Sequence, residues 1–251
     1  MSTPKKLKRS TSEAGTNTYV GNMDILIGKC TIFGPVFNPQ NKDLQIESLK
    51  ELSAHVKHSI NDVDYLFAQA VVAEGNRQEW FALLYPTVTR VLAVAVSLRL
   101  PAAALIHIRE IIRKIRGTRA KPILPTPPLE GEEPKKHSSV SQRSFREQVE
   151  HINQLIAIVA AQPLYTPAEQ ELTVDALNKL RDEMGVANDA ADETASQLEE
   201  ARAERDKLLY TPVTGMMDTA LAVKEYVKAL FGAASPEYKE VRHLKFRNKK
   251  I

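Results

Sequence analysis

Two long stretches of the chain place hydrophobic or small residues at alternating spacings of three and four. In the first stretch these positions are Leu49, Leu52, Val56, Ser59, Val63, Leu66, Ala70 and Ala73; in the second they are Leu177, Leu180, Met184, Ala187, Ala191, Thr194, Leu198 and Ala201. This spacing is typical of a coiled-coil seam, in which small residues let two helices approach closely. The pattern therefore predicts two long helices, which we expect to end near Leu84 and Leu209.

Each long helix contains one glycine, Gly75 or Gly185, and no proline. A hairpin bent at the glycine is the alternative to a continuous helix, but no cluster of turn-forming residues surrounds Gly185. We therefore favour a continuous helix of about 43 residues, roughly 65 Å long. At the start of each helix, Asn38 or Thr166 is expected to be the N-cap, with proline at the first helical position.

Shorter helices are expected on both sides of the second long helix. Residues 145–161 place Val149, Ile152, Leu155, Ile156 and Val159 on one face, and residues 213–230 are largely apolar. Gly232 is expected to be the C-cap of the latter helix, and Pro236 to prevent its continuation.

The two long helices belong to a longer internal similarity. Residues 37–52 align with residues 165–180 at an offset of 128, and residues 77–86 align with residues 202–211 at an offset of 125. The change of three residues is close to one helical turn, so a helix can absorb it. We interpret the two halves as a duplication.

The predicted fold is all-α: an elongated four-helix bundle made from two tandem helical repeats, each with one long helix and flanking shorter helices. The expected segments are a basic and polar flexible tail (1–21), repeat 1 (22–119), a proline-rich linker (120–139), repeat 2 (140–234) and a basic C-terminal tail (235–251). The linker contains five prolines and several carboxylates, which disfavour both helix and burial.

The composition agrees with a helical, globular chain. Hydrophobic residues make up 43% of the 251 residues and aromatic residues only 6%, with 10 glycines, which favours helices over sheets. The single cysteine, Cys30, excludes an internal disulfide. The most apolar segment, residues 91–98, is far shorter than the about 20 residues of a membrane span. The polar N-terminus does not resemble a secretory signal, so we expect no membrane span and a cytoplasmic protein.

Positive charge is clustered at the two ends of the chain and near its middle, between residues 109 and 121, although the net charge is only +3, and the ends are the candidates for binding. The residues concerned are Lys5, Lys6, Lys8 and Arg9 at one end and Lys245, Arg247, Lys249 and Lys250 at the other. Basic tails of this kind can neutralise nucleic-acid phosphates. They are also common as plain solvated ends, so nucleic-acid binding is an alternative hypothesis.

One stripe of the first long helix carries residue types that can bind a metal. Glu51, His55, His58 and Asp62 share one helix face, and imidazole and carboxylate at this spacing can hold Zn²⁺ or iron. Such a stripe is more commonly a solvated flank, and no pattern supplies a ligand from a facing helix. Glu-x-x-His, which di-iron bundles need twice, occurs once, at residues 240–243.

No phosphate-binding glycine loop and no nucleophile elbow occurs in the sequence. Cys30 could pair with a distant histidine as a nucleophile, but any chain with a cysteine and six histidines permits this pairing. The sequence therefore predicts no cofactor, no catalytic residues and no enzymatic activity.

Arg77, Trp80 and Phe81 form a candidate partner-binding site near the end of the first long helix. The aligned part of the second half carries Arg205 and Asp206 in place of the two aromatic residues. Tryptophan and arginine are enriched among the residues that dominate interface energies. Filling the core is the other role that Trp80 can have.

The second half of the chain, from about residue 141, resembles a family of uncharacterised helical proteins from Bacteroidetes bacteria. The resemblance rests on the segments 165–172, 175–177, 208–210, 223–228 and 231–239, of which the Phe-Gly-x-x-Ser-Pro-x-Tyr-Lys tail is the most specific. The first half lacks this tail. The resemblance implies a helical bundle and no particular chemistry.

The function predicted from the sequence is a non-enzymatic helical scaffold or protein–protein interaction protein, with a protein partner or a second copy of itself as its ligand. The alternative is a nucleic-acid-associated protein that binds through its basic termini.

Overall fold

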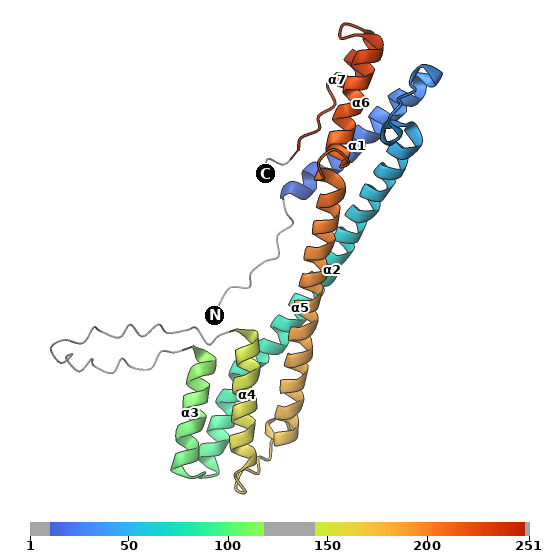
Figure 1. Cartoon of the computed structure of the whole chain (residues 1–251). Helices are drawn as coiled ribbons and strands as arrows, with labels where there is room; N and C mark the ends of the chain where they lie inside the picture. Colours follow the sequence, from blue (N-terminus) through green and yellow to red (C-terminus); the bar gives the residue numbers. More distant parts are fainter. Residues whose placement is uncertain (1–10, 118–143, 249–251) are drawn as a thin grey trace, which may run out of the picture. The chain divides into compact units, whose positions relative to one another are not determined.

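The computed structural model describes residues 11–117 and 144–248, and within these ranges it contains seven α-helices, three short 3₁₀ helices and no strand. The α-helices are α1 (Thr11–Ile32), α2 (Ile46–Ser97), α3 (Ala102–Arg116), α4 (Phe145–Ala160), α5 (Val174–Tyr210), α6 (Met216–Phe231) and α7 (Pro236–Arg242) (Figure 1). The 3₁₀ helices are η1 (Gly34–Val36), η2 (Lys42–Leu44) and η3 (Gln170–Leu172). The expected all-α class is confirmed.

The chain divides into two compact units that do not follow the expected order of repeats. Unit 1 comprises residues 1–71 and 194–251, and unit 2 comprises residues 72–193. We expected consecutive units at 22–119 and 140–234. The long helices explain the difference, because α2 and α5 each contribute one part of their length to each unit.

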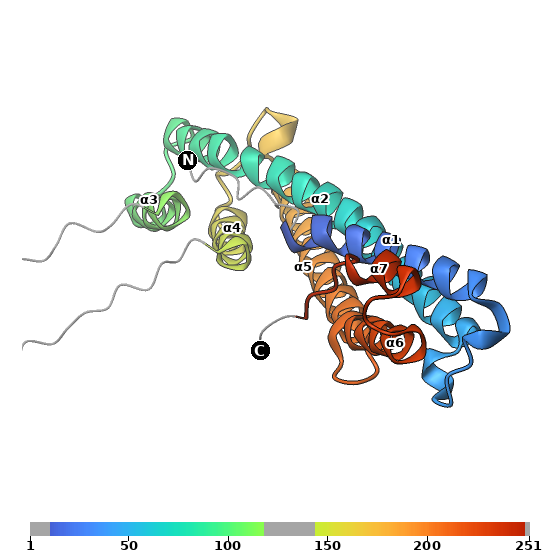
Figure 2. The ribbon, with the colours of Figure 1, turned by 90° about the horizontal axis from the view of Figure 1, so that it is seen from above.

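Unit 2 is a four-helix bundle built from the second part of α2, from α3 and α4, and from the first part of α5. Its core contains residues from all four segments, for example Leu84 of α2, Ile108 of α3, Leu155 of α4 and Met184 of α5, none of which is exposed. The helices α3 and α4 lie side by side (Figures 1 and 2). The predicted apolar face of α4 is confirmed, because Ile152, Leu155, Ile156 and Val159 are buried.

Unit 1 is built from α1, the first part of α2, the second part of α5, α6 and α7. In Figure 2, α1, α6 and α7 gather around α2 and α5. Its main core joins Leu26 of α1, Leu49 of α2, Leu209 of α5 and Val223 of α6. A smaller cluster of Val63, Ala70 and Leu198 continues along α2 and α5.

Both long helices are continuous, as predicted. The helix α5 passes through Gly185, and α2 passes through Gly75 and extends beyond the predicted end at Leu84 to Ser97, with Pro86 inside the helix. Every predicted seam position of both helices is buried or half-buried. The 3–4 spacing therefore identified the faces that pack.

The predicted helix entries are wrong. Neither α2 nor α5 begins at the Asn38-Pro39 or Thr166-Pro167 dipeptide, since each helix is preceded by a 3₁₀ turn and starts at Ile46 or Val174. The side chain of Asn41 accepts a hydrogen bond from the backbone of Asp43 and caps η2. The starts of η2 and η3 and those of α2 and α5 are separated by the same 128 residues as the aligned sequence segments. The duplication itself stays a prediction.

The described parts of the two predicted tails have defined structure. Residues 11–21 belong to α1, and Gly232 is the C-cap of α6 as predicted, but Pro236 starts α7. Val241, Leu244 and Phe246 are buried in the core of unit 1. Residues 1–10 and 249–251 and the predicted linker 120–139 lie outside the described residues.

Candidate functional site

The four candidate metal ligands remain on one exposed face of α2. Glu51, His55, His58 and Asp62 are all exposed, and the closest approach that links two of them is 3.5 Å, between Nε2 of His58 and Oδ2 of Asp62. Among the described residues, no group of three or more His, Cys, Asp or Glu side chains is arranged to hold a metal ion. The geometry therefore gives no support to a metal site on this stripe.

Cys30 lies in the core of unit 1 and has no exposed surface. Burial raises the pKa of its thiol to about 12, because the thiolate would lose its hydration. The thiolate is the nucleophilic form of cysteine. Cys30 is therefore a packed, unreactive side chain in the folded protein.

The side chains of Arg77 and Phe81 contact other parts of unit 2. Phe81 is 5% exposed, and its ring packs edge-on against that of Phe145, with 4.7 Å between the ring centroids. The guanidinium of Arg77 lies 4.3 Å from the centre of the Phe145 ring. Trp80 is half-buried against the unit 2 core. These contacts leave little of Arg77 and Phe81 for a partner, whose binding at this site stays a prediction.

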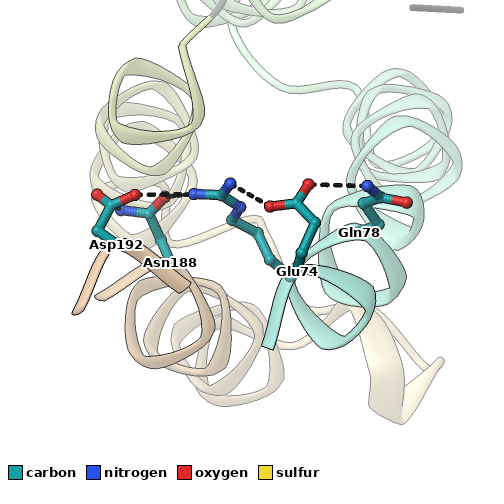
Figure 3. A network of polar contacts seen from close by, with 5 residues as sticks. Glu74, Gln78, Asn188 and Asp192 are labelled. Carbon is teal, nitrogen blue, oxygen red and sulfur yellow. Dashed lines mark hydrogen bonds and ion pairs between the residues drawn. The ribbon is translucent and has the colours of Figure 1, made fainter. Parts of the chain in front are cut away.

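Arg77 is also the centre of a polar network that connects α2 with α5 (Figure 3). Its Nη1 donates to Oδ1 of Asp192 over 2.9 Å and to Oδ1 of Asn188 over 3.3 Å, and its Nη2 forms an ion pair with Glu74. Gln78 donates to the other carboxylate oxygen of Glu74 over 2.7 Å. The network holds the two helices in register, because a guanidinium donates in fixed directions.

The Arg77 side chain is mostly removed from water, at 14% exposure, and so is that of Glu74, at 20%. A charge that is buried to this extent needs a partner, since an unpaired one is costly. Glu74, Asn188 and Asp192 were not predicted from the sequence, where Arg77 was expected to be a surface residue. The Glu-x-x-Arg spacing on one helix was a local signal for the first of these contacts.

The side of α2 that points away from the unit 2 core is unusually poor in charge. We call this side the outer face of α2. It consists of Val72, Gly75, Glu79, Ala82, Pro86, Thr89, Ala93 and Val96, which again follow the 3–4 spacing. All of them are exposed except the half-buried Gly75. Leu83, which is 49% exposed, borders this face.

A solvent-facing helix side is normally polar, whereas a helix that is apolar all round is normally covered by protein or lipid. The helix α2 is long and apolar enough to cross a membrane by length and composition, yet only 28% of its most apolar window is buried within the chain. Such a helix is weak evidence for a membrane span, because the core helices of other proteins pass the same test. The outer face of α2 is thus a largely apolar surface, and the contact that the described residues make with it is the hydrogen bond of 2.8 Å that Arg116 of α3 donates to Thr89.

His151 on α4 is an unusual polar residue of the unit 2 interior. It is 6% exposed, and neither ring nitrogen makes a hydrogen bond of standard geometry within the described part of the chain, although the side chain of Gln154 interacts with the ring. Burial lowers its pKa, and the positive charge of Lys114 on α3 lowers it further. The carboxylates of Glu147 and Glu150 act in the opposite direction. The balance of these effects disfavours the protonated form of His151.

The described basic residues near the C-terminus are Lys245 and Arg247, and both are exposed. They alternate with the buried Leu244 and Phe246 in a segment that is anchored to unit 1. The amide of Asn22 donates to the carbonyl of Lys245 over 3.0 Å, and the ammonium of Lys224 donates to that of Leu244 over 2.8 Å. The remaining candidates for nucleic-acid binding, Lys5, Lys6, Lys8, Arg9, Lys249 and Lys250, lie outside the described residues.

Comparison with protein-family models, with curated proteins and with solved structures gave no match. The resemblance to a Bacteroidetes family therefore stays a prediction.

Proposed function

We propose that this chain is a non-enzymatic helical interaction protein that associates with a second copy of itself through the outer face of α2. The observation that supports the proposal is the exposed 3–4 pattern of small and apolar residues on that face. Two helices that carry such a pattern bury it by packing against each other.

A second protein copy fits this face better than lipid. The neighbouring helices of unit 2 expose charged side chains, such as Arg109 and Arg113 of α3 and Glu150 of α4. Charged groups are costly inside the hydrocarbon of a membrane. A bilayer around α2 would bring these helices into the same apolar layer, whereas a protein partner covers only one face.

The outer face is also complementary to itself in an antiparallel arrangement. A twofold axis at the level of Leu84 places Val72 opposite Val96 and Ala82 opposite Pro86. The same axis places Glu79 next to Arg90 of the other copy. Twofold symmetry makes each contact occur twice, which is the commonest geometry of homodimers.

The size of the face sets the expected strength of association. Residues 72–96 extend over roughly 36 Å of helix, and a single helix pair of this length buries less than the about 1,200 Å² of a typical stable interface. We therefore expect weak dimers that form at micromolar to millimolar concentrations.

Sedimentation velocity over about 10 to 500 µM tests the proposal, since this range covers weak dissociation constants. We expect the average mass to rise with concentration for the natural chain. Replacing Ala82 and Ala93 with Glu should abolish the rise, because both positions lie opposite the core of unit 2. The matched control is Ala157→Glu, an exposed alanine on α4 of the same unit.

Two results would contradict the proposal. One is a monomer at every concentration, and the other is a dimer that Ala82→Glu/Ala93→Glu leaves intact. Co-sedimentation with vesicles of neutral phosphatidylcholine addresses the membrane alternative. Vesicle binding that the double variant removes would assign the face to lipid and overturn self-association.

A further inference from the structure

A groove runs along unit 1 between α2 and α5, next to the small cluster of Val63, Ala70 and Leu198 that joins the two helices. Its volume is about 480 Å³. The lining residues are Ser59, Asp62, Tyr65 and Leu66 of α2 and Gln197, Glu200, Ala201 and Glu204 of α5. We call this feature the acidic groove.

The acidic groove combines an apolar floor with a negatively charged rim. Leu66 and Ala201 are half-buried at its base, whereas the carboxylates of Asp62, Glu200 and Glu204 are exposed. The ring of Tyr65 is 64% exposed at the edge. Carboxylates attract ammonium and guanidinium groups, and an aromatic ring adds a favourable contact for either cation.

Two of the rim carboxylates have local partners on their own helix that a ligand could replace. Asp62 lies 3.5 Å from His58, and Glu204 forms an ion pair with Lys207. All four side chains of these two pairs are more than half exposed. Exposed pairs of this kind contribute little to stability, so exchanging these partners for the cations of a bound segment costs little.

We propose that the acidic groove binds the basic segment formed by residues 5–9 of this chain, Lys-Lys-Leu-Lys-Arg. This segment supplies four cations for the rim and one leucine for the floor. We select this occupant because its cations complement the carboxylates of the rim and its leucine complements the apolar floor. The proposal does not depend on self-association through the outer face of α2.

The position of α1 makes the groove reachable. Asp24 of α1 contacts Ser53 and Lys57 of α2 through hydrogen bonds of 2.8 Å. The two helices run in opposite directions (Figure 1). From Asp24 back to Thr11 the helix extends roughly 20 Å, which brings its start to the level of the groove along α2. An extended segment of six residues reaches about 20 Å further, enough to pass around one helix.

A labelled peptide with the sequence of residues 1–10 tests the proposal by fluorescence anisotropy. The peptide is titrated with the full chain and with a full-chain variant in which Lys5, Lys6, Lys8 and Arg9 are replaced by Gln. We expect this variant to bind the peptide about tenfold more tightly than the natural chain, because its own segment no longer competes for the groove. Adding Glu200→Lys and Glu204→Lys should remove binding.

The matched control is Glu47→Lys with Glu51→Lys, which makes the same change of charge elsewhere on unit 1 and should leave the affinity unchanged. Raising the salt concentration from about 50 to 300 mM should weaken binding several-fold, since salt screens exposed charges. Absence of peptide binding to the Gln variant would overturn the proposal. Equal losses in the groove and control variants would overturn it as well, because binding would then follow net charge.

Sedimentation of the natural chain separates binding within one molecule from binding between molecules. If the segment occupies the groove of its own chain, the Gln variant and the natural chain have the same mass at about 1 µM, far below the range expected for weak dimers. A dimer that the Gln substitutions dissociate would instead place the segment in the groove of a second copy, which contradicts the proposal as stated.

Discussion

Replacing Arg77 with Ala is the most informative test of the polar network in unit 2. The substitution removes the cation that faces Glu74, Asn188 and Asp192, together with the contact to the Phe145 ring. We expect unit 2 to lose about 3 kcal/mol of stability. This value lies at the lower end of the cost of breaking a buried ion pair, because Arg77 and Glu74 retain some exposure.

The separate contacts of Arg77 contribute unequally to this cost. Leaving the mostly buried Glu74 without its cation costs about 2 kcal/mol. The contact with Phe145 contributes about 1 kcal/mol. Asp192 is 55% exposed, so its ion pair is worth at most about 0.5 kcal/mol. The variant Asp192→Ala should therefore be much milder than Arg77→Ala.

Urea unfolding followed by tryptophan fluorescence measures the effect. Trp80 is the only tryptophan of the chain and packs against the core of unit 2, so its emission reports on this unit. With a slope of about 1.5 kcal/mol per M urea, a loss of 3 kcal/mol lowers the midpoint by about 2 M.

Two further variants separate charge from geometry. Arg77→Lys retains the charge but not the planar fork, so we expect about half of the loss. Arg77→Met combined with Glu74→Leu replaces the pair by apolar groups and should be nearly neutral. A loss below about 1 kcal/mol for Arg77→Ala, or equal losses for Arg77→Ala and Asp192→Ala, would refute the assignment of Glu74 as the main partner.

Two other substitutions give independent tests of the structure. Val213 has a φ of 72°, a conformation that β-branched residues disfavour, and it is 81% exposed. Val213→Gly should therefore raise stability by about 0.5 to 1 kcal/mol, and Val213→Ala should give a smaller gain. Destabilisation by Val213→Gly in thermal unfolding would contradict this account. His151 has a lowered pKa, so the unfolded chain binds its proton more readily and the contribution of His151 to stability is lost as the pH falls below about 6.5. His151→Leu should flatten the pH dependence of the unfolding free energy between about pH 7 and 5 and raise stability by about 1 kcal/mol at pH 7. An unaltered slope in His151→Leu would show that other groups cause the dependence.

The periodic pattern predicted the helices well because burial along a helix follows its geometry. The seam from Leu49 to Ala73 is buried or half-buried at every position, and Gly75 did not interrupt α2. Helix starts were predicted poorly, since an Asn-Pro or Thr-Pro dipeptide allows several turn conformations. In the structure a separate 3₁₀ turn, Lys42–Leu44, lies between the Asn38-Pro39 dipeptide and the helix start at Ile46.

The candidate sites depend on contacts that a linear pattern does not contain. Arg77 meets Asn188 and Asp192 across 111 and 115 residues of sequence. No periodicity links these positions, so the sequence suggested a surface role for Arg77. The outer face of α2 was not predicted from the sequence, because the helix was expected to end near Leu84 and its exposed side is defined only once the core of unit 2 is known.

The arrangement of the two units has a consequence for synthesis of the protein. Unit 2 is one continuous segment of chain, whereas unit 1 requires residues from both ends. On the ribosome, α1 and the start of α2 emerge first, yet their core partners in α6 and α7 are made last. Because domains fold when their residues are available, unit 2 can complete its core before unit 1. The apolar sides of α1 and of the first part of α2 therefore remain exposed in the nascent chain until α6 and α7 are made. We expect chaperones to bind mainly to these sides during synthesis.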